Sequence, residues 1–273
     1  MTVKDIKIAW DKVNLSRNKE RPSSNYYIYE IADKFVELHG DRCYGDDKAV
    51  IAGIGKINNI SVCMIGISKG ENTKENIERN FGMASPEGYK KSLRIMKFAE
   101  SQSMPIICFI DTPGAYCGVE AEENGQGMAI ANNLMEMSKL KVPIISVFIG
   151  QGGSGGALAL GVCDKALMLE NAIYSILSPE GFASILWKDS SRVKEASEKM
   201  RLTSEDLKKL NIIDRIIEEP EGGAQNDRTL MAMSLKKVIL EEIQKLMKCD
   251  VNSIVEERYM KYRSTGKNHT LIS

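Results

Sequence analysis

One pattern occurs twice along the chain and restricts the fold more than any other feature. A predicted helix precedes MPIICFID at residues 104–111, another precedes VPIISVFIG at residues 142–150, and the two Pro-Ile-Ile triplets lie 38 residues apart. Continuous apolar runs that begin at a proline are typical of parallel strands covered on both faces. The sequence therefore predicts an α/β fold in which helices alternate with neighbouring parallel strands.

Glycine-rich loops follow both of these strands, at residues 111–127 and 150–156. The carboxyl ends of parallel strands meet at one edge of a sheet, and ligand sites gather at that edge. We therefore expect the two loops to lie side by side and to form the functional site.

The second loop, GQGGSGG, places five glycines around Ser154. Its letters match the G-x-S-x-G elbow of serine hydrolases, whose serine needs a histidine base. The chain contains only His39 and His269. The usual order of serine, acid and histidine would require His269 to lie at the site.

Three other interpretations of this loop stay open at the level of the residues. Gly150, Gly152 and Gly155 match the G-x-G-x-x-G of dinucleotide-binding folds, with Glu170 about 20 residues further on, although a helix at 156–163 would be short for a crossover. Alternatively, consecutive glycine amides form an oxyanion hole for an enolate or carboxylate oxygen. The third is a turn that only lets a helix pack tightly on a strand.

Charge, hydropathy and cysteine spacing favour some classes of protein over others. The 273 residues include 37 basic and 37 acidic side chains and give a net charge of zero, so we expect no nucleic acid partner. Because no apolar run reaches the roughly 20 residues of a membrane span and charged residues occur within the first five positions, we expect a cytoplasmic chain without membrane contact. The six cysteines lack C-x-x-C spacing, so we predict no bound metal and no disulfide.

Local signals predict further elements around the two central strands. A tight turn at Asn58-Asn59 is expected to join a hairpin. The expected ranges are helices at 27–38, 86–101, 179–187, 202–211 and 230–249, strands at 49–57, 60–68, 165–169 and 173–177, and a loop at 69–80.

Four motifs together resemble the α-subunit family of bacterial, multi-subunit acetyl-CoA carboxylase carboxyltransferases. They are DTPGAY at 111–116, GGSGGA at 152–157, YSILSPEGFASILWKD at 174–189, and NFGM at 80–83 with PEGY at 86–89. The resemblance covers residue 25 onward. It implies a crotonase-like (ClpP/crotonase) spiral of ββα repeats with flanking helices. The expected division is a polar N-terminal segment at 1–25, a carboxyltransferase domain at 26–250 and a C-terminal tail at 251–273.

The resemblance implies the transfer of a carboxyl group from carboxybiotin to acetyl-CoA, giving malonyl-CoA in the first committed step of fatty acid biosynthesis. The biotin would be carried on a separate biotin carboxyl carrier protein. The implied partners are a β subunit in an α2β2 assembly, that carrier protein and biotin carboxylase. Met-Lys pairs occur at 96, 247 and 260 without a biotinyl-domain context, so we expect no covalent cofactor on this chain.

The resemblance also assigns roles to individual residues. The amides of Gly155 and Gly156 are expected to be catalytic as the biotin-side oxyanion hole, while the β subunit supplies the thioester-side hole. From their position in the neighbouring strand-end loop, Gly114 and Ala115 are expected to line the biotin or acyl pocket, with a simple strand-ending turn as the alternative. From its position after a strand, Lys69 is expected to meet a phosphate of CoA, with an ordinary surface lysine as the alternative.

Four positions depart from the family pattern. Cys117, Gln151, Ile67 and Glu71 stand where members commonly carry Pro, Glu, His and Arg, and the last two reduce the basic character beside Lys69. The long helical N-terminal extension of some members is not found, so its contacts with the partner are expected to be missing or replaced. The alternatives are a related biotin-dependent acyl-CoA carboxyltransferase or decarboxylase subunit, and a scaffold subunit without catalysis.

Overall fold

The computed structural model describes residues 8–266. Its centre is a single mixed sheet with the strand order β1-β2-β3-β4-β5-β6-β8, and β7 pairs with the far end of β5. The pairs β1–β2 and β2–β3 are antiparallel, and all the others are parallel. The strands are β1 (Lys34–Glu37), β2 (Val50–Ile57), β3 (Ile60–Ile67), β4 (Ile106–Thr112), β5 (Ile144–Gly153), β6 (Lys165–Leu169), β7 (Ile173–Ser175) and β8 (Arg215–Ile217).

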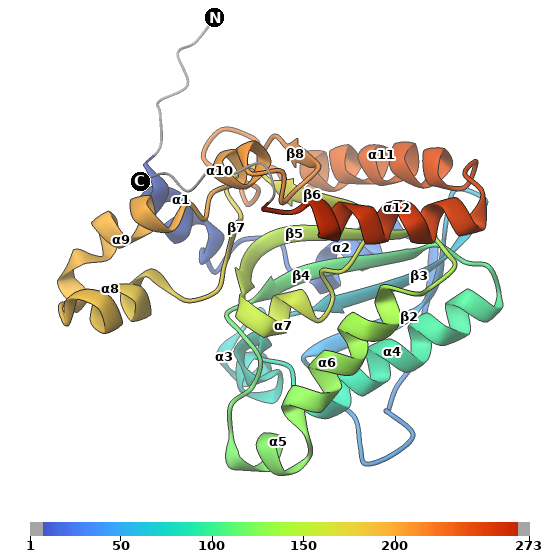
Figure 1. Cartoon of the computed structure of the whole chain (residues 1–273), viewed down its shortest axis with the longest axis horizontal. Helices are drawn as coiled ribbons and strands as arrows, with labels where there is room; N and C mark the ends of the chain where they lie inside the picture. Colours follow the sequence, from blue (N-terminus) through green and yellow to red (C-terminus); the bar gives the residue numbers. More distant parts are fainter. Residues whose placement is uncertain (1–7, 267–273) are drawn as a thin grey trace, which may run out of the picture.

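Helices cover both faces of this sheet (Figure 1). α4 and α6 pack together on one face, whereas α2 packs on the other face and contacts α11. The helices are α1 (Ala9–Ser16), α2 (Ser24–Ile31), α3 (Thr73–Glu78), α4 (Pro86–Ser101), α5 (Val119–Glu123), α6 (Gln126–Met137), α7 (Ser154–Leu158), α8 (Pro179–Trp187), α9 (Val193–Met200), α10 (Ser204–Lys209), α11 (Arg228–Leu246) and α12 (Val251–Ser264), with 3-10 turns at Asn80–Gly82 and Ser190–Arg192.

The 38-residue repeat corresponds to the strand register. Ile106 of β4 pairs with Ile144 of β5 in parallel, so equivalent residues of the two repeats are direct neighbours. All seven residues of β4 are buried, as expected for a strand covered on both faces. The α/β fold class and the two central strands are confirmed.

Two local predictions were wrong in part. The helix expected at 27–38 ends at Ile31, and Lys34–Glu37 instead forms β1, which pairs with the open edge of β2. This tertiary pairing outweighs a weak helical pattern. The loop expected at 69–80 contains α3, whose N-terminus is capped because Asn72 accepts a hydrogen bond from the Glu75 amide. The hairpin turn is confirmed, with Asn58 at φ +44°.

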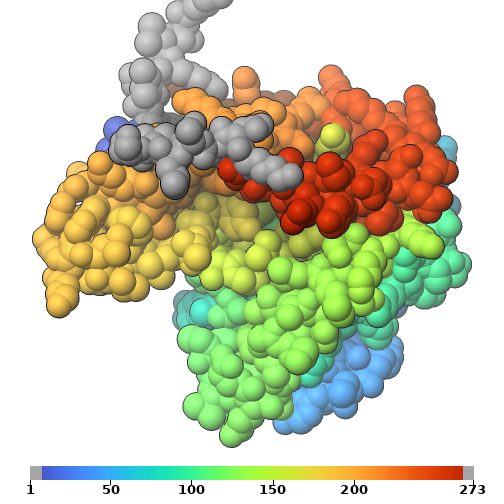
Figure 2. All heavy atoms as spheres, in the orientation of Figure 1, coloured from blue at the N-terminus to red at the C-terminus, as the bar shows by residue number. Residues whose placement is uncertain are grey.

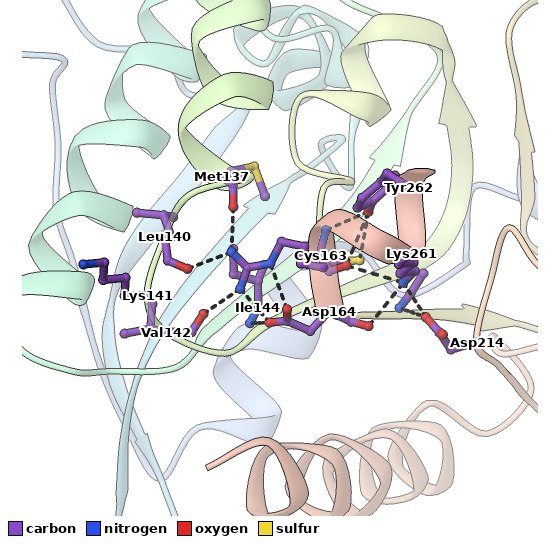
Figure 3. A network of polar contacts seen from close by, with 12 residues as sticks. Met137, Leu140, Lys141, Val142, Ile144, Cys163, Asp164, Asp214, Lys261 and Tyr262 are labelled. Atoms are coloured by element: carbon purple, nitrogen blue, oxygen red, sulfur yellow. Dashed lines mark hydrogen bonds and ion pairs between the residues drawn. The ribbon is translucent and has the colours of Figure 1, made fainter. Parts of the chain in front are cut away.

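Both end segments pack onto the body of the molecule. Val13 of α1 is fully buried, and Arg258 in α12 is only 1% exposed. Figure 3 shows the surroundings of this arginine, where carbonyl groups of Met137, Leu140 and Val142 converge near Asp164. The division at residues 25 and 250 stays a prediction, and the structure adds that residues outside it contribute to the core.

Within residues 8–266, no helix is long and apolar enough to cross a membrane.

Candidate functional site

The loops after β4 and β5 lie directly against each other, as expected from the sequence. Thr112 pairs with Gly152, and the two backbones then approach so closely that side chains would not fit. A Cβ atom on Gly153 would lie 2.1 Å from the carbonyl oxygen of Pro113, and one on Gly156 would lie 2.5 Å from the amide nitrogen of Ala115. These two glycines are therefore required by packing.

Gly155 has a different environment from its neighbours. It is half-buried, and a Cβ atom there would meet only Ile130, at an ordinary contact distance of 3.8 Å. Close packing therefore does not explain this glycine. Its amide belongs to the first turn of α7, where N–H groups have no partner within the helix.

Ser154 is exposed and has φ +48°, a left-handed conformation that costs free energy in a residue with a side chain. Within residues 8–266, its hydroxyl group has no hydrogen-bond partner. His39 instead contacts Asp46 in the loop before β2, with an Nδ1 to Oδ2 distance of 3.1 Å, and His269 lies outside the described residues. The hydrolase interpretation therefore lacks a base in the described part of the chain.

The dinucleotide interpretation also loses support. α7 has only five residues, too few to cross back over the sheet. Glu170 accepts a hydrogen bond from the Glu219 amide at 3.0 Å, so its carboxylate takes part in joining two strand ends.

A cavity of about 310 Å³ opens beside the glycine loop. In Figure 2 the surface is hollowed between the yellow and orange α8–α9 segment and the green α5–α6 segment. Arg17 forms a two-pronged ion pair with Glu180 at the cavity wall, with an Nη1 to Oε1 distance of 2.6 Å. The lining residues are Arg17, Pro113, residues 151–154, Ile173 and residues 175–180.

Lys69 joins the ends of three strands. Its Nζ atom lies 2.7 Å from Asp111 Oδ1 and 3.0 Å from Gln151 Oε1, so it links β3, β4 and β5. The Lys69 side chain is 25% exposed, and its ammonium group is already paired with a carboxylate. A phosphate of CoA would have to share this charge, and that contact stays a prediction.

The structure thus brings four of the five predicted site residues together. Gly114, Ala115, Gly155 and Gly156 lie in the two adjoining loops, whereas Lys69 lies one strand further away beside Gln151. Arg17 and Glu180 could not be predicted from the sequence, because a pair 163 residues apart leaves no local pattern. Among residues 8–266, no three His, Cys, Asp or Glu side chains are grouped so that they could hold a metal ion.

A buried ion pair lies close to the start of the glycine loop. Arg21 Nη1 lies 2.9 Å from Glu219 Oε2, and the two side chains are 2% and 0% exposed. Glu219 also accepts hydrogen bonds from Asn171 and from the Ala224 amide. Burial alone raises the pKa of Glu219, but the Arg21 charge and these hydrogen bonds outweigh it and hold the pKa below its usual value of 4.5.

This shift predicts a pH-dependent stability. Because the pKa of Glu219 is lower in the folded chain than in the unfolded chain, its contribution is present above pH 4.5 and is lost as the pH falls from there. The Glu219→Gln variant leaves Arg21 unpaired, and we expect it to be less stable by about 3 to 5 kcal/mol at pH 7. Urea unfolding should show that the difference in free energy of unfolding between Glu219→Gln and the unaltered chain becomes smaller below pH 4.5. Glu256→Gln, at an exposed position, serves as the control. If its free energy of unfolding relative to the unaltered chain changed with pH in the same way, the assignment to Glu219 would be contradicted.

The family described as "Acetyl co-enzyme A carboxylase carboxyltransferase-like" matches residues 3–266. The chain belongs to this family. The "Acetyl-coenzyme A carboxylase carboxyl transferase subunit alpha" of Clostridium perfringens strain ATCC 13124 is 60% identical over 260 residues, which cover 95% of this chain and 96% of that protein. A Clostridium tetani relative named "subunits beta/alpha" is 54% identical over 98% of this chain and 47% of its own length.

Solved structures show the same fold at low sequence identity. A Pseudomonas malonate decarboxylase heterotetramer superimposes with a TM-score of 0.68 at 13% identity, covering 86% of this chain and 92% of that chain. Transcarboxylase 12S gives 0.63 at 18% identity over 86% and 45% of the two chains. These neighbours confirm the crotonase-like fold class of this family member.

Proposed function

We propose that this family member is the α subunit of acetyl-CoA carboxylase carboxyltransferase. It would transfer a carboxyl group from carboxybiotin, held on a separate biotin carboxyl carrier protein, to acetyl-CoA, giving malonyl-CoA. The observation that supports this most strongly is the 60% identity to a relative of that name over nearly the full length of both chains. The proposal includes a cytoplasmic location and biotin carboxylase as a further component.

The proposed chemistry rests on backbone donors. Biotin that has given up its carboxyl group supplies a ring oxygen with negative charge, and this oxygen needs fixed hydrogen-bond donors. The amides of Gly155 and Gly156 in the first turn of α7 are suited to this, because a backbone N–H holds its position and does not release its proton. At Gly155 a Cβ atom would meet only Ile130, at an ordinary contact distance.

The remaining predicted residues receive roles from their positions. Gly114 and Ala115 contact Gly156 through their backbone atoms and would form the adjoining wall of the acyl or biotin pocket. Lys69 would bind a phosphate of CoA while keeping its contact with Asp111.

A β subunit in an α2β2 assembly is the proposed partner. It would supply the donors for the thioester oxygen, which must also hold charge when the acetyl group loses a proton. The Clostridium tetani relative supports this pairing, because its name joins β and α subunits and this chain aligns with only 47% of it.

The test is malonyl-CoA formation from acetyl-CoA and carboxylated carrier protein. We expect turnover when this chain and its β partner are mixed, and none with either chain alone. No turnover in a well-formed complex would contradict the proposal. Turnover with methylmalonyl-CoA or release of CO2 from malonyl-CoA in place of acetyl-CoA carboxylation would indicate a related carboxyltransferase or decarboxylase.

A further inference from the structure

β5 contains a bulge at the start of the glycine loop. The pairing of β4 with β5 has an offset of 38 residues at Ile110 and Phe148 but an offset of 40 at Thr112 and Gly152. Three residues of β5, 149–151, therefore face only Asp111 of β4. A bulge bends its strand and leaves backbone groups without a partner in the ladder.

Side chains from outside β5 form hydrogen bonds with these backbone groups. The carbonyl oxygen of Ile149 accepts a hydrogen bond from Arg21 Nε at 2.6 Å, and the Gln151 amide donates to Asp111 Oδ1 at 2.9 Å. Gly150 leaves room for the Asp111 carboxylate, because a Cβ atom there would lie 2.5 Å from Oδ1. The bulge is thus built around these two charged side chains.

The bulge determines where the glycine loop begins. The last residue of the bulge, Gln151, and the next residue, Gly152, pair with β7 in parallel, and Gly152 also pairs with Thr112 of β4. Residues 151–154 then line the cavity before α7 starts at Ser154. A change in the bulge would therefore displace the cavity wall and the amides that follow it.

We propose that Asp111 and Arg21 are positioning residues, which hold the bulge in β5 so that the amides of residues 152–156 point correctly into the site. This inference rests on the proposed function for its kinetic consequence. Neither residue needs to touch a reactant, since Asp111 is 9% and Arg21 2% exposed at the side chain. Lys69 shares Asp111 Oδ1 and keeps the carboxylate in place.

Asp111 allows a clean test, whereas loss of Arg21 would leave the charge of Glu219 buried and unpaired. Asp111→Ala removes the acceptor for the Gln151 amide, and Asp111→Asn keeps an acceptor oxygen. Displacing catalytic donors by about 1 Å costs roughly 100-fold in rate. We expect kcat of the assembled enzyme to fall about 100-fold in Asp111→Ala with KM nearly unchanged, and most of this loss to be rescued in Asp111→Asn.

Hydrogen exchange provides a second readout that does not depend on activity. Amides of residues 149–156 should exchange faster in Asp111→Ala than in Asp111→Asn or the unaltered chain. The control, Asp47→Ala, removes another buried carboxylate that accepts backbone hydrogen bonds, from Ala49 and Ser85, and should leave exchange at 149–156 unchanged.

Unchanged exchange in Asp111→Ala would overturn the inference, whatever the activity. Faster exchange with unchanged kcat would also overturn it, because the bulge would then not position the donors. Faster exchange in an assembly whose unaltered form makes no malonyl-CoA would support the bulge assignment and count against the proposed function.

Discussion

The variant Ser154→Gly/Gly155→Pro is expected to lose about 100- to 1000-fold in kcat, corresponding to roughly 3 to 4 kcal/mol of transition-state stabilisation. Proline removes the N–H group at 155 but is tolerated in the first turn of a helix. A Cβ atom at position 155 would meet only Ile130, at 3.8 Å. The change at Ser154 is needed because a residue before proline avoids helical dihedrals, and Ser154 is already left-handed. The measurement is steady-state malonyl-CoA formation by the assembly.

Two single variants control for the change in shape. Gly155→Ala keeps the N–H group and adds a methyl group at ordinary contact distance, and Ser154→Gly relieves the left-handed strain. Both should keep kcat within a few-fold of the unaltered assembly. Full turnover in the double variant would remove Gly155 from the catalytic residues. A bulky residue at Gly156 is a poorer test, because it would collide with the backbone of Gly114 and Ala115.

Arg258→Met is expected to destabilise the chain by about 3 to 5 kcal/mol. The guanidinium group donates five hydrogen bonds, two to Asp164 and one each to the carbonyl groups of Met137, Leu140 and Val142, at 2.7 to 2.9 Å. Without it, the Asp164 carboxylate stays buried and loses its countercharge, although it still accepts from the Ile144 amide (Figure 3). Thermal unfolding should show Tm lower by roughly 10 °C.

An exposed arginine on the same helix provides the matched control. Arg263→Met should change stability by no more than about 0.5 kcal/mol. Adding Asp164→Asn to Arg258→Met removes the unpaired charge and should recover part of the loss. Equal stability of Arg258→Met and the unaltered chain would contradict this account of α12.

Much of the central sheet could be predicted from the sequence because its signals are local. The Pro-Ile-Ile triplets mark equivalent positions on two neighbouring strands, and the register of Ile106 and Ile144 reproduces their spacing. The serine-proline pairs marked the starts of α4 and α8, both of which end where expected, at Ser101 and Trp187.

The parts that were missed depend on contacts between distant segments. β1 forms because β2 offers an open edge, and nothing within residues 34–37 signals that edge. Arg21 reaches Ile149 across 128 residues, so the bulge at 149–151 could not be inferred from either segment alone. For the loop itself, the glycine pattern predicted a site but did not distinguish Gly153 and Gly156, which packing requires, from Gly155, which it does not.

The contacts of Arg258 also affect the order in which the molecule can be completed during synthesis. Residues 137–164 leave the ribosome well before this arginine, which follows Asp164 by 94 positions. Until it arrives, the carbonyl groups of Leu140 and Val142 and the carboxylate of Asp164 lack the hydrogen bonds from the guanidinium group. Contacts of such long sequence separation slow folding. The start of β5, where the Ile144 amide donates to Asp164, is therefore completed only after α12 has been synthesised.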